Sequence, residues 1–332
     1  MSGAAAEVTA EPIRTAHASG LGAVARELAG MHRAMLRGGD DDRSVRLSVM
    51  TLVVACAGEE AADRAAEVIG TIAARHPARA LLVIARRDGP GGIEADLQLA
   101  CHIAGGSQQV CAETVRLRVG GEAAQHLGSV VAPLLLPDVP VMLWVAGAAP
   151  LEQALAAPTL AMCERVVLDS SAWTEPREPF TAIAGAGHQA LPVVDLAWLR
   201  LRPWREFLAR AVDAPTRRRR LLAGGIGIRV MGDDAAARLL GGWLAARLES
   251  TVEPLSAGPL AAVELEAGGG ALRVRVAATE DGIETAVDLD GERVAARRIP
   301  LTAPVDSDLV GAALEAEGTD PVYLQAVRAA LA

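Results

Sequence analysis

The chain has 332 residues, a formal net charge of −9 and a hydrophobic fraction of 51%, which suits a protein of about two domains. All 32 of its cationic side chains are arginine, and they form no long basic stripe. Because nucleic-acid binding depends on clustered positive charge that neutralises phosphates, we expect no nucleic-acid partner. No apolar run reaches the roughly 18 residues of a membrane span, and the first 20 residues lack the apolar core of a signal peptide. Since four cysteines are too few for a secreted disulfide scaffold, we expect a cytoplasmic protein.

Residues 1–43 are expected to form a helical N-terminal arm. Within it, residues 21–37 carry apolar side chains at helical spacing. These are Leu21, Val24, Leu28, Met31 and Met35. Such a stripe either docks on the chain's own domain or forms a short coiled-coil seam with a partner. We favour docking, because the stripe covers too few heptads to define a coiled coil.

Residues 44–213 alternate predicted strands with predicted helices. This alternation is typical of a largely parallel or mixed sheet that is covered on both faces, so we expect a first, α/β domain over this range. The predicted strands are 44–58, 78–86, two strands within 93–119, 140–147 and 164–171. The predicted helices are 59–77, 122–136 and 151–161.

A proline, four consecutive arginines and two glycines mark residues 214–224 as a solvated linker. Beyond the linker, a strand and a helix precede four short alternating strands with glycine-rich turns, which is typical of an antiparallel meander. Helices are predicted at about 306–317 and 320–331. The sequence therefore predicts a smaller, α+β domain with an antiparallel sheet over residues 225–332.

A search for catalytic motifs finds no convincing constellation. The stretch AGGIGIR at 223–229 precedes a strand rather than a helix, so it lacks the context of a dinucleotide-binding loop. Ser170 lacks the G-x-S-x-G elbow of a hydrolase, and we expect it in a turn at the end of a strand. The histidines have no i, i+4 spacing and the cysteines no C-x-x-C spacing. We therefore expect no catalytic residues, no metal site and no cofactor, as in a binding or regulatory subunit.

Cys101 and Cys111 flank the predicted turn at residues 105–107. A three-residue loop would place the two cysteines directly opposite each other, whereas a two-residue loop would put them on opposite faces. A facing pair is a candidate redox pair. We favour the alternative of two buried, reduced thiols, because disulfides are rare in the cytoplasm.

The stretch DLAWLRLRPWREFLA, residues 195–209, concentrates aromatic side chains in a chain whose aromatic content is only 2%. Asp195 is a predicted N-cap, and Pro203 suits the first position of a second helix. Trp204 and Phe207 share one face of that helix, so we expect them to anchor it against the sheet of the first domain. The alternative is a docking surface, since Trp and Arg are enriched at interface hot spots. Its candidate partner-binding residues are Trp198, Arg200, Arg202 and Arg205.

Several segments together resemble a known family. They are HPARALLV, GGSQQVCAETVRL, SVVAPLLLPDVPVMLWVAG, RVVLDSS, VVDLAWLRLRPWREFLARAVDAP and LLGGWLAARL, in this order. The combination resembles the glucose-6-phosphate dehydrogenase assembly protein family, OpcA. The resemblance runs from about Ser44 to the end and is strongest across 76–213.

The resemblance implies a non-catalytic partner that binds glucose-6-phosphate dehydrogenase, promotes its assembly and acts as its allosteric activator. Such a partner supports NADPH production in the oxidative pentose phosphate pathway. In cyanobacterial relatives the family is linked to thioredoxin-dependent control through cysteines near the C-terminus. The last cysteine here is Cys163, so that control is not carried over. The alternative function is a small-molecule sensor or an enzyme with a ligand cleft between its two domains.

Overall fold

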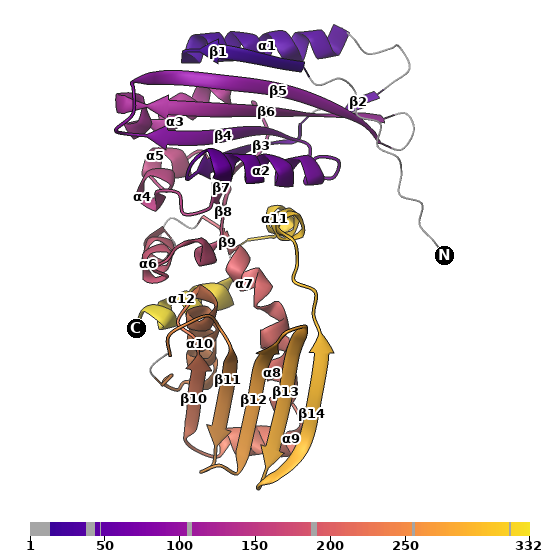
Figure 1. Cartoon of the computed structure of the whole chain (residues 1–332), viewed down its shortest axis with the longest axis vertical. Coiled ribbons are helices and arrows are strands. Elements are labelled where there is room, and N and C mark those ends of the chain that lie inside the picture. The colour runs from indigo at the N-terminus through magenta and orange to yellow at the C-terminus, as the bar shows by residue number, and fades with distance from the viewer. Residues whose placement is uncertain are drawn as a thin grey trace. The chain divides into compact units, whose positions relative to one another are not determined.

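The computed structural model describes residues 14–37, 44–46, 48–104, 108–186, 191–253, 256–318 and 320–332. They fold into two compact units. The first comprises the described residues up to Leu168 together with Val310–Glu315, and the second comprises those of Asp169–Leu309 and Ala316–Ala332. The first unit contains a mixed sheet and the second an antiparallel sheet with helices, which confirms the predicted fold class (Figure 1).

A single mixed sheet forms the centre of the first unit. Its strands are β1 (Arg14–Ser19), β2 (Ser44–Arg46), β3 (Met50–Cys56), β4 (Ala78–Arg86), β5 (Gly92–Ala104), β6 (Gln108–Gly120), β7 (Val141–Ala146) and β8 (Arg165–Leu168). They lie in the order β1-β5-β6-β4-β3-β7-β8, with β2 paired to β6. The pairs β1–β5 and β5–β6 are antiparallel and the others are parallel. The side chains of β7 are all buried and those of β3 and β4 nearly all, as expected for strands covered on both faces.

Helices α1 (Leu21–Arg37) and α2 (Glu59–Ile72) pack on this sheet. Helix α1 contacts β1 and β5, and α2 contacts β3, β4 and β7. Val24, Leu28 and Met31 of α1 are buried, so the prediction that this amphipathic stripe docks on its own domain is confirmed.

A buried ion pair lies beneath α1. Arg79 of β4 and Glu113 of β6 are directly opposite each other, and Arg79 Nε donates to Glu113 Oε2 at 2.5 Å. Arg79 also donates to the carbonyl of Leu134, and the Nδ1 atom of His32 in α1 lies 3.3 Å from Glu113 Oε1. This pair was not predicted from the sequence. Breaking one partner of such a pair is strongly destabilising, because it leaves an uncompensated buried charge.

The β5–β6 hairpin has the register of the three-residue-loop alternative. Cys101 is directly opposite Cys111 in the backbone ladder. Residues 105–107, the predicted loop, lie outside the described residues, and so do the side chains of both cysteines. The structure therefore selects the three-residue alternative, whereas the redox state of the pair stays a prediction.

The segments between β6 and β8 differ from the two continuous helices that were predicted. Residues 122–136 form the 3-10 helix η1 (Gly121–Gln125), the short helix α3 (Leu127–Val131) and the 3-10 helix η2 (Ala132–Leu134). His126 has non-helical φ and ψ angles of −124° and 45°, which interrupts the helix there. Residues 151–161 split into α4 (Leu151–Ala154) and α5 (Ala157–Leu160), and Pro158 cannot donate the hydrogen bond that would continue α4.

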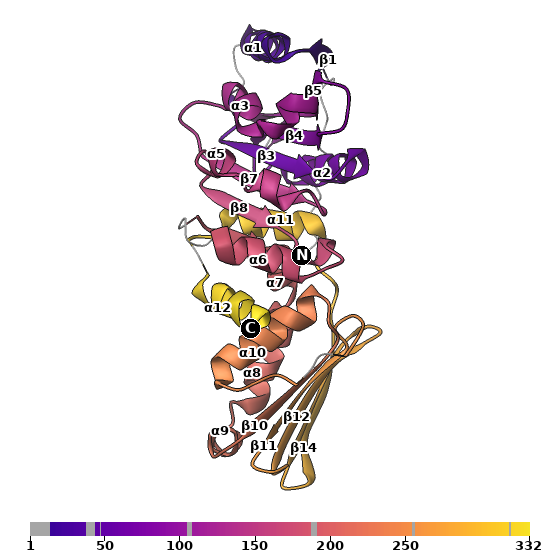
Figure 2. The same ribbon diagram turned by 90° about the vertical axis from the view of Figure 1, so that its left-hand side faces the viewer.

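The second unit contains a five-stranded antiparallel meander and its covering helices. The strands are β10 (Ile226–Met231), β11 (Ala262–Ala267), β12 (Leu272–Thr279), β13 (Gly282–Leu289) and β14 (Glu292–Pro300), paired in chain order. The remaining elements are η3 (Ser170–Ala172), α6 (Arg177–Ala186), β9 (Val193–Asp195), α7 (Leu196–Arg200), α8 (Arg202–Val212), α9 (Pro215–Leu222), α10 (Ala235–Leu248) and α12 (Pro321–Leu331). Helix α11 (Asp306–Glu315) contributes residues to both units. Figure 2 shows the meander nearly edge-on, with α8, α9 and α10 on one side of it.

The division between the units differs from the predicted domain boundary. Residues 169–213 belong to the second unit, so the chain divides after Leu168 rather than at 213. The predicted linker at 214–224 is largely the helix α9, which begins at Pro215 and buries Leu221. Ser170 lies in η3 directly after β8, as predicted for a turn residue at a strand end. Helix α6 was not predicted.

Helices α10 and α12 approach each other closely at Gly242 (Figure 2). A Cβ atom at this position would lie 2.2 Å from the carbonyl oxygen of Ala326 and 2.9 Å from the amide nitrogen of Ala330. The neighbouring Gly241 has room, because its nearest neighbour would be a Val230 methyl at 3.5 Å. The packing therefore requires glycine at position 242 but not at position 241.

Substituting the two glycines separately tests this packing. We expect Gly242→Ala to lower the free energy of unfolding by about 2 kcal/mol or more, because the new methyl collides with backbone atoms. Gly241→Ala is the matched control, and the better helix propensity of alanine should make it neutral or stabilising by up to about 1 kcal/mol. Urea unfolding, monitored by circular dichroism, measures the free energy of unfolding of both variants. Equal effects of the two substitutions would contradict the close approach.

Candidate docking surface of the second unit

The aromatic stretch begins at a buried carboxylate. Asp195 is fully buried and caps α7, which confirms its predicted N-cap role. Its Oδ1 atom accepts hydrogen bonds from the backbone N–H groups of Ser170 and Ala197, each at 3.0 Å, and its Oδ2 atom accepts one from the Tyr323 hydroxyl at 3.0 Å. Burial raises the pKa of Asp195 to about 6, despite the backbone N–H donors that favour the charged form.

Trp198 is the aromatic anchor of this stretch. Its side chain is buried, with 3% of the residue exposed, and its Nε1 atom donates to Asp320 Oδ2 at 2.8 Å. Its ring lies 5.7 Å from the Tyr323 ring, at an interplanar angle of 49°. The alternative in which Trp198 lies on the surface is therefore wrong.

Trp204 and Phe207 do not anchor α8 in the predicted way. Both are only partly buried, whereas Leu208 and Ala211 are the buried residues of this helix. Helix α8 packs on β12 and β13, the antiparallel sheet of its own unit, whereas the prediction assigned it to the α/β sheet. The pattern within α8 identified the buried face only in part, because Leu208 and Ala211 rather than the two rings are its buried residues.

The three candidate arginines have different environments. The Arg205 guanidinium lies 3.5 Å from the centre of the Trp198 ring and donates to the Trp198 carbonyl, and its partial burial lowers its pKa to about 10. Arg200 pairs with Asp169 at 2.6 Å and with Asp306 at 2.9 Å. Arg202 is exposed and pairs with Glu206 one helical turn away. A partner-binding role for Arg200, Arg202 and Arg205 stays a prediction, whereas the burial of Trp198 argues against direct contact between its ring and a partner.

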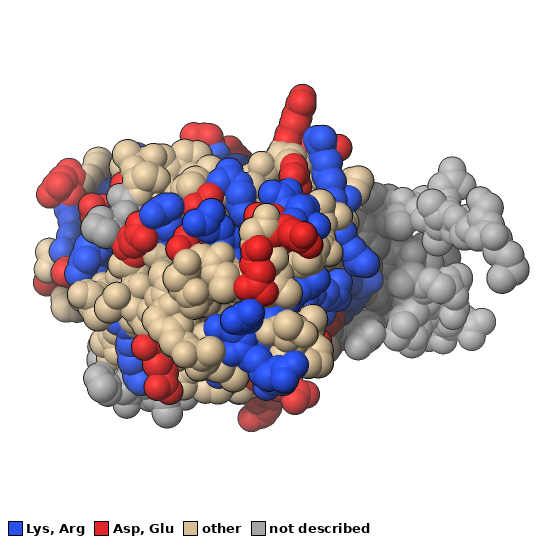
Figure 3. Space-filling view, turned by 90° about the horizontal axis from the view of Figure 1, so that it is seen from below, with Lys and Arg blue, Asp and Glu red and all other residues tan. Residues whose placement is uncertain are grey.

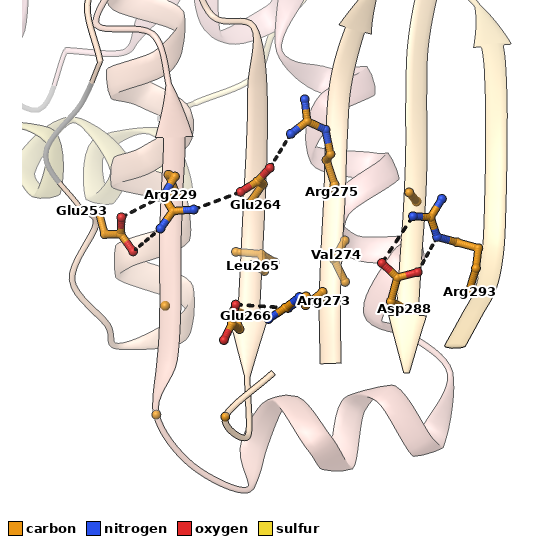
Figure 4. Close-up of a pocket in the computed structure, with 14 residues that line it drawn as sticks. Arg229, Glu253, Glu264, Leu265, Glu266, Arg273, Val274, Arg275, Asp288 and Arg293 are labelled. Atoms are coloured by element: carbon orange, nitrogen blue, oxygen red, sulfur yellow. Dashed lines mark hydrogen bonds and ion pairs between the residues drawn. The ribbon is translucent and has the colours of Figure 1, made fainter. Parts of the chain in front are cut away.

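The open face of the meander holds a pocket of about 660 Å³ (Figure 4). Charges of opposite sign alternate across its strands in two rows. We call these rows the sheet-face ladder. One row is Arg229, Glu264 and Arg275, and the next is Glu266, Arg273, Asp288 and Arg293. The hollow forms where the rows contain the small residues Gly227 and Ala286.

The sheet-face ladder neutralises itself. Arg229 pairs with Glu253 at 2.9 Å and with Glu264 at 3.2 Å, and Glu264 also pairs with Arg275. Arg273 pairs with Glu266 at 3.3 Å, and Arg293 pairs with Asp288. Each carboxylate that lines the pocket thus has an arginine partner (Figure 4). The alternation of Glu264 and Glu266 with Arg273 and Arg275 is visible in the sequence, although no site was predicted from it.

The two thiols whose side chains the structure describes, Cys56 and Cys163, both have raised pKa values. Desolvation raises the pKa of the Cys56 thiol to about 12 and that of Cys163 to about 11, and a thiol rather than a thiolate is a poor nucleophile. Within the described ranges, no group of three or more His, Cys, Asp or Glu side chains is placed to hold a metal ion. None of the helices in the same ranges has both the length and the hydropathy needed to cross a membrane.

The fold and the site together define a two-unit protein with a mixed α/β sheet, an antiparallel meander and a self-neutralised charged pocket on the meander. Comparison with known families then places it. Residues 69–185 match the N-terminal domain of the glucose-6-phosphate dehydrogenase subunit family, and residues 191–327 match the C-terminal domain of the same family. The chain belongs to this family, OpcA, as its sequence indicated.

Two relatives and one solved structure illustrate the similarity. A protein of Synechococcus elongatus named "Putative OxPP cycle protein OpcA" is 30% identical over 77% of this chain and 56% of its own length. A protein of the same name from Synechocystis is 30% identical over 55% of this chain and 40% of its own length. The chain thus spans about half the length of these relatives. An aldose-aldose oxidoreductase from Caulobacter crescentus is 13% identical, with a TM-score of 0.40 over 85% of this chain and 95% of its own, which is too low for inference.

Removing the Trp198 ring should destabilise the fold. We expect Trp198→Ala to lower the free energy of unfolding by about 3–5 kcal/mol, the usual effect of truncating a buried ring. Trp204→Ala is the matched control and should have an effect nearer 1 kcal/mol, because its ring is partly exposed. Chemical denaturation measures both. An equal or larger effect of Trp204→Ala would contradict the assignment of Trp198 as the anchor.

The buried carboxyl of Asp195 should produce a pH dependence. Its pKa is about 6 in the folded protein and 3.8 ordinarily, so the folded state retains the proton to higher pH than the unfolded chain. Its contribution to the free energy of unfolding therefore falls as pH rises through this interval, by about 3 kcal/mol in total. Asparagine can accept both backbone N–H bonds at Oδ1 and donate to Tyr323. The wild type should lose stability over this interval, whereas the Asp195→Asn variant should not. We thus expect the free energy of unfolding of Asp195→Asn, relative to that of the wild type, to increase by about 2–3 kcal/mol between pH 4 and pH 7.

Denaturation of both proteins at several pH values measures this difference. Asp195→Ala is the contrasting variant, since it leaves the three donors unpaired and should be destabilised at every pH. A constant difference between Asp195→Asn and the wild type over this interval would show that Asp195 titrates normally.

Proposed function

We propose that this protein is a non-catalytic assembly factor and allosteric activator of glucose-6-phosphate dehydrogenase. The observation that carries the proposal is that both domains of the glucose-6-phosphate dehydrogenase subunit family match in order along one chain. Because the chain spans about half the length of its relatives, the partner and the activation are proposals for this protein. In this role it supports NADPH production in the oxidative pentose phosphate pathway.

The chemistry of the described residues supports recognition rather than catalysis. The charges of the pocket are engaged with one another, and the thiols Cys56 and Cys163 are held in their protonated form. An activator needs only a surface that binds the active state of its partner more tightly than the inactive state. We further propose a cytoplasmic protein without a cofactor or nucleic-acid partner, and a Cys101–Cys111 pair that stays reduced.

Titration into the cognate dehydrogenase tests the proposal. We expect the isolated chain to have no dehydrogenase activity, and its addition to raise the turnover of the dehydrogenase or lower its KM for glucose 6-phosphate. The effect should saturate, because activation by differential binding is limited by occupancy. Steady-state kinetics at fixed enzyme and increasing chain measures it. Unchanged kinetics under conditions where binding is confirmed would contradict activation.

The alternative function is a small-molecule sensor or an enzyme. The melting temperature of the isolated chain, with and without ligand, distinguishes it from the assembly factor. Glucose 6-phosphate, NADP and NAD are added separately, since only a ligand of the folded state raises the melting temperature. The assembly proposal predicts no shift with any of the three. A saturable shift with one of them would favour the sensor.

A further inference from the structure

Helix α9 is a fixed element of the second unit. It begins at Pro215, buries Leu221 and contacts α8, β11 and β12. Arg220 donates from Nη2 to both carboxylate oxygens of Asp290, at 3.0 and 3.1 Å, and Arg217 donates to the carbonyl of Ala211 at 3.1 Å. The run of four arginines is therefore presented on a helix whose position is set by its neighbours.

The exposed surface of α9 includes two arginines and a leucine. Arg218 and Arg219 are exposed, and within the described part of the chain neither has a carboxylate at ion-pair distance. Leu222 is 73% exposed, more than any other exposed large apolar side chain of the described residues. Spacings of three and four residues place Leu222 beside both arginines on the helix surface. We call Arg218, Arg219 and Leu222 the α9 patch.

The α9 patch differs from the sheet-face ladder in one decisive respect. Every arginine of the ladder is already paired with a carboxylate, so a charged partner would have to displace an existing ion pair there. The α9 patch has uncompensated positive charge beside an apolar side chain, in a chain whose net charge is −9. Figure 3 shows this end of the second unit, where basic and acidic side chains lie beside uncharged surface.

We infer that the α9 patch docks against an acidic surface of the partner dehydrogenase, with Leu222 in an apolar contact between the two arginine contacts. This inference rests on the proposed function for the identity of the partner. Complementary charge of this kind accelerates association and selects the partner, while burial of the apolar side chain slows dissociation. A second copy of this chain docked through the same patch would bring like charges together, which disfavours a symmetric dimer.

Charge reversal of the patch provides the test. The variant Arg218→Glu/Arg219→Glu is compared with Arg247→Glu/Arg328→Glu, which has the same change in net charge at exposed positions of α10 and α12. Binding of each chain to immobilised dehydrogenase is measured by surface plasmon resonance at low and high salt, after melting curves have verified folding. We expect the patch variant to bind about tenfold more weakly, mainly through slower association, and to lose most of the salt dependence of the wild type. Leu222→Ser should instead accelerate dissociation.

The outcomes separate the inference from the proposed function. If the wild type binds and both double variants bind equally well, the α9 patch is not the contact and the inference is wrong, while the proposed function stands. If the wild type does not bind the dehydrogenase at all, both are wrong. Self-association of the wild type that the patch variant loses would identify a second copy as the occupant and would also overturn the inference.

Discussion

The buried carboxyl of Asp195 is the interaction on which the second unit depends. It joins segments that are far apart in the sequence: the turn after β8 through the Ser170 N–H, the start of α7 through the Ala197 N–H, and α12 through the Tyr323 hydroxyl. A buried carboxyl needs several donors, because unpaired polar groups are costly in a dry interior. All three donors must therefore be in place together, which fixes the mutual positions of these segments.

Other elements of the second unit are connected to this carboxyl through successive contacts. Tyr323 packs against Trp198, and Asp320, the N-cap of α12, accepts the Trp198 indole N–H. Helix α12 in turn packs on α10 at Gly242, and α10 contacts β10 of the meander. The Asp195 and Trp198 hydrogen bonds thus join these elements in the interior, whereas the ion pairs of the sheet-face ladder and the α9 patch lie on the outer surface. This arrangement suits a protein whose outer surfaces recognise a partner.

The parts of the structure that were predicted correctly are those determined by local pattern. Strand β4 was predicted with its observed ends, and the N-cap role of Asp195 follows from its position before α7. The observed β5–β6 register is one of the two that the sequence left open. The meander was identified from alternation and glycine-rich turns. In each case, the determining residues are neighbours in the sequence.

The parts that were not predicted depend on contacts between distant residues. Trp198 and Trp204 are the same residue type in the sequence, and contacts with Tyr323 and Asp320, more than 100 residues away, help to bury Trp198. The arginine run was predicted as a linker because four consecutive charges are typical of a solvated segment. In the structure, burial of Leu221 holds this segment against the second unit as a helix. Arg79 and Glu113 are charged residues in strands, and their burial depends on their pairing across β4 and β6. The proposed assembly role, by contrast, rests on family membership rather than on any single residue.

Sedimentation velocity of the cognate dehydrogenase, alone and with this chain added, tests the central claim most directly. The account predicts that the chain co-sediments with the dehydrogenase and shifts it towards a larger assembled species in a saturable way. Two boundaries that sediment independently at all ratios, with the dehydrogenase unchanged in size, would contradict the account.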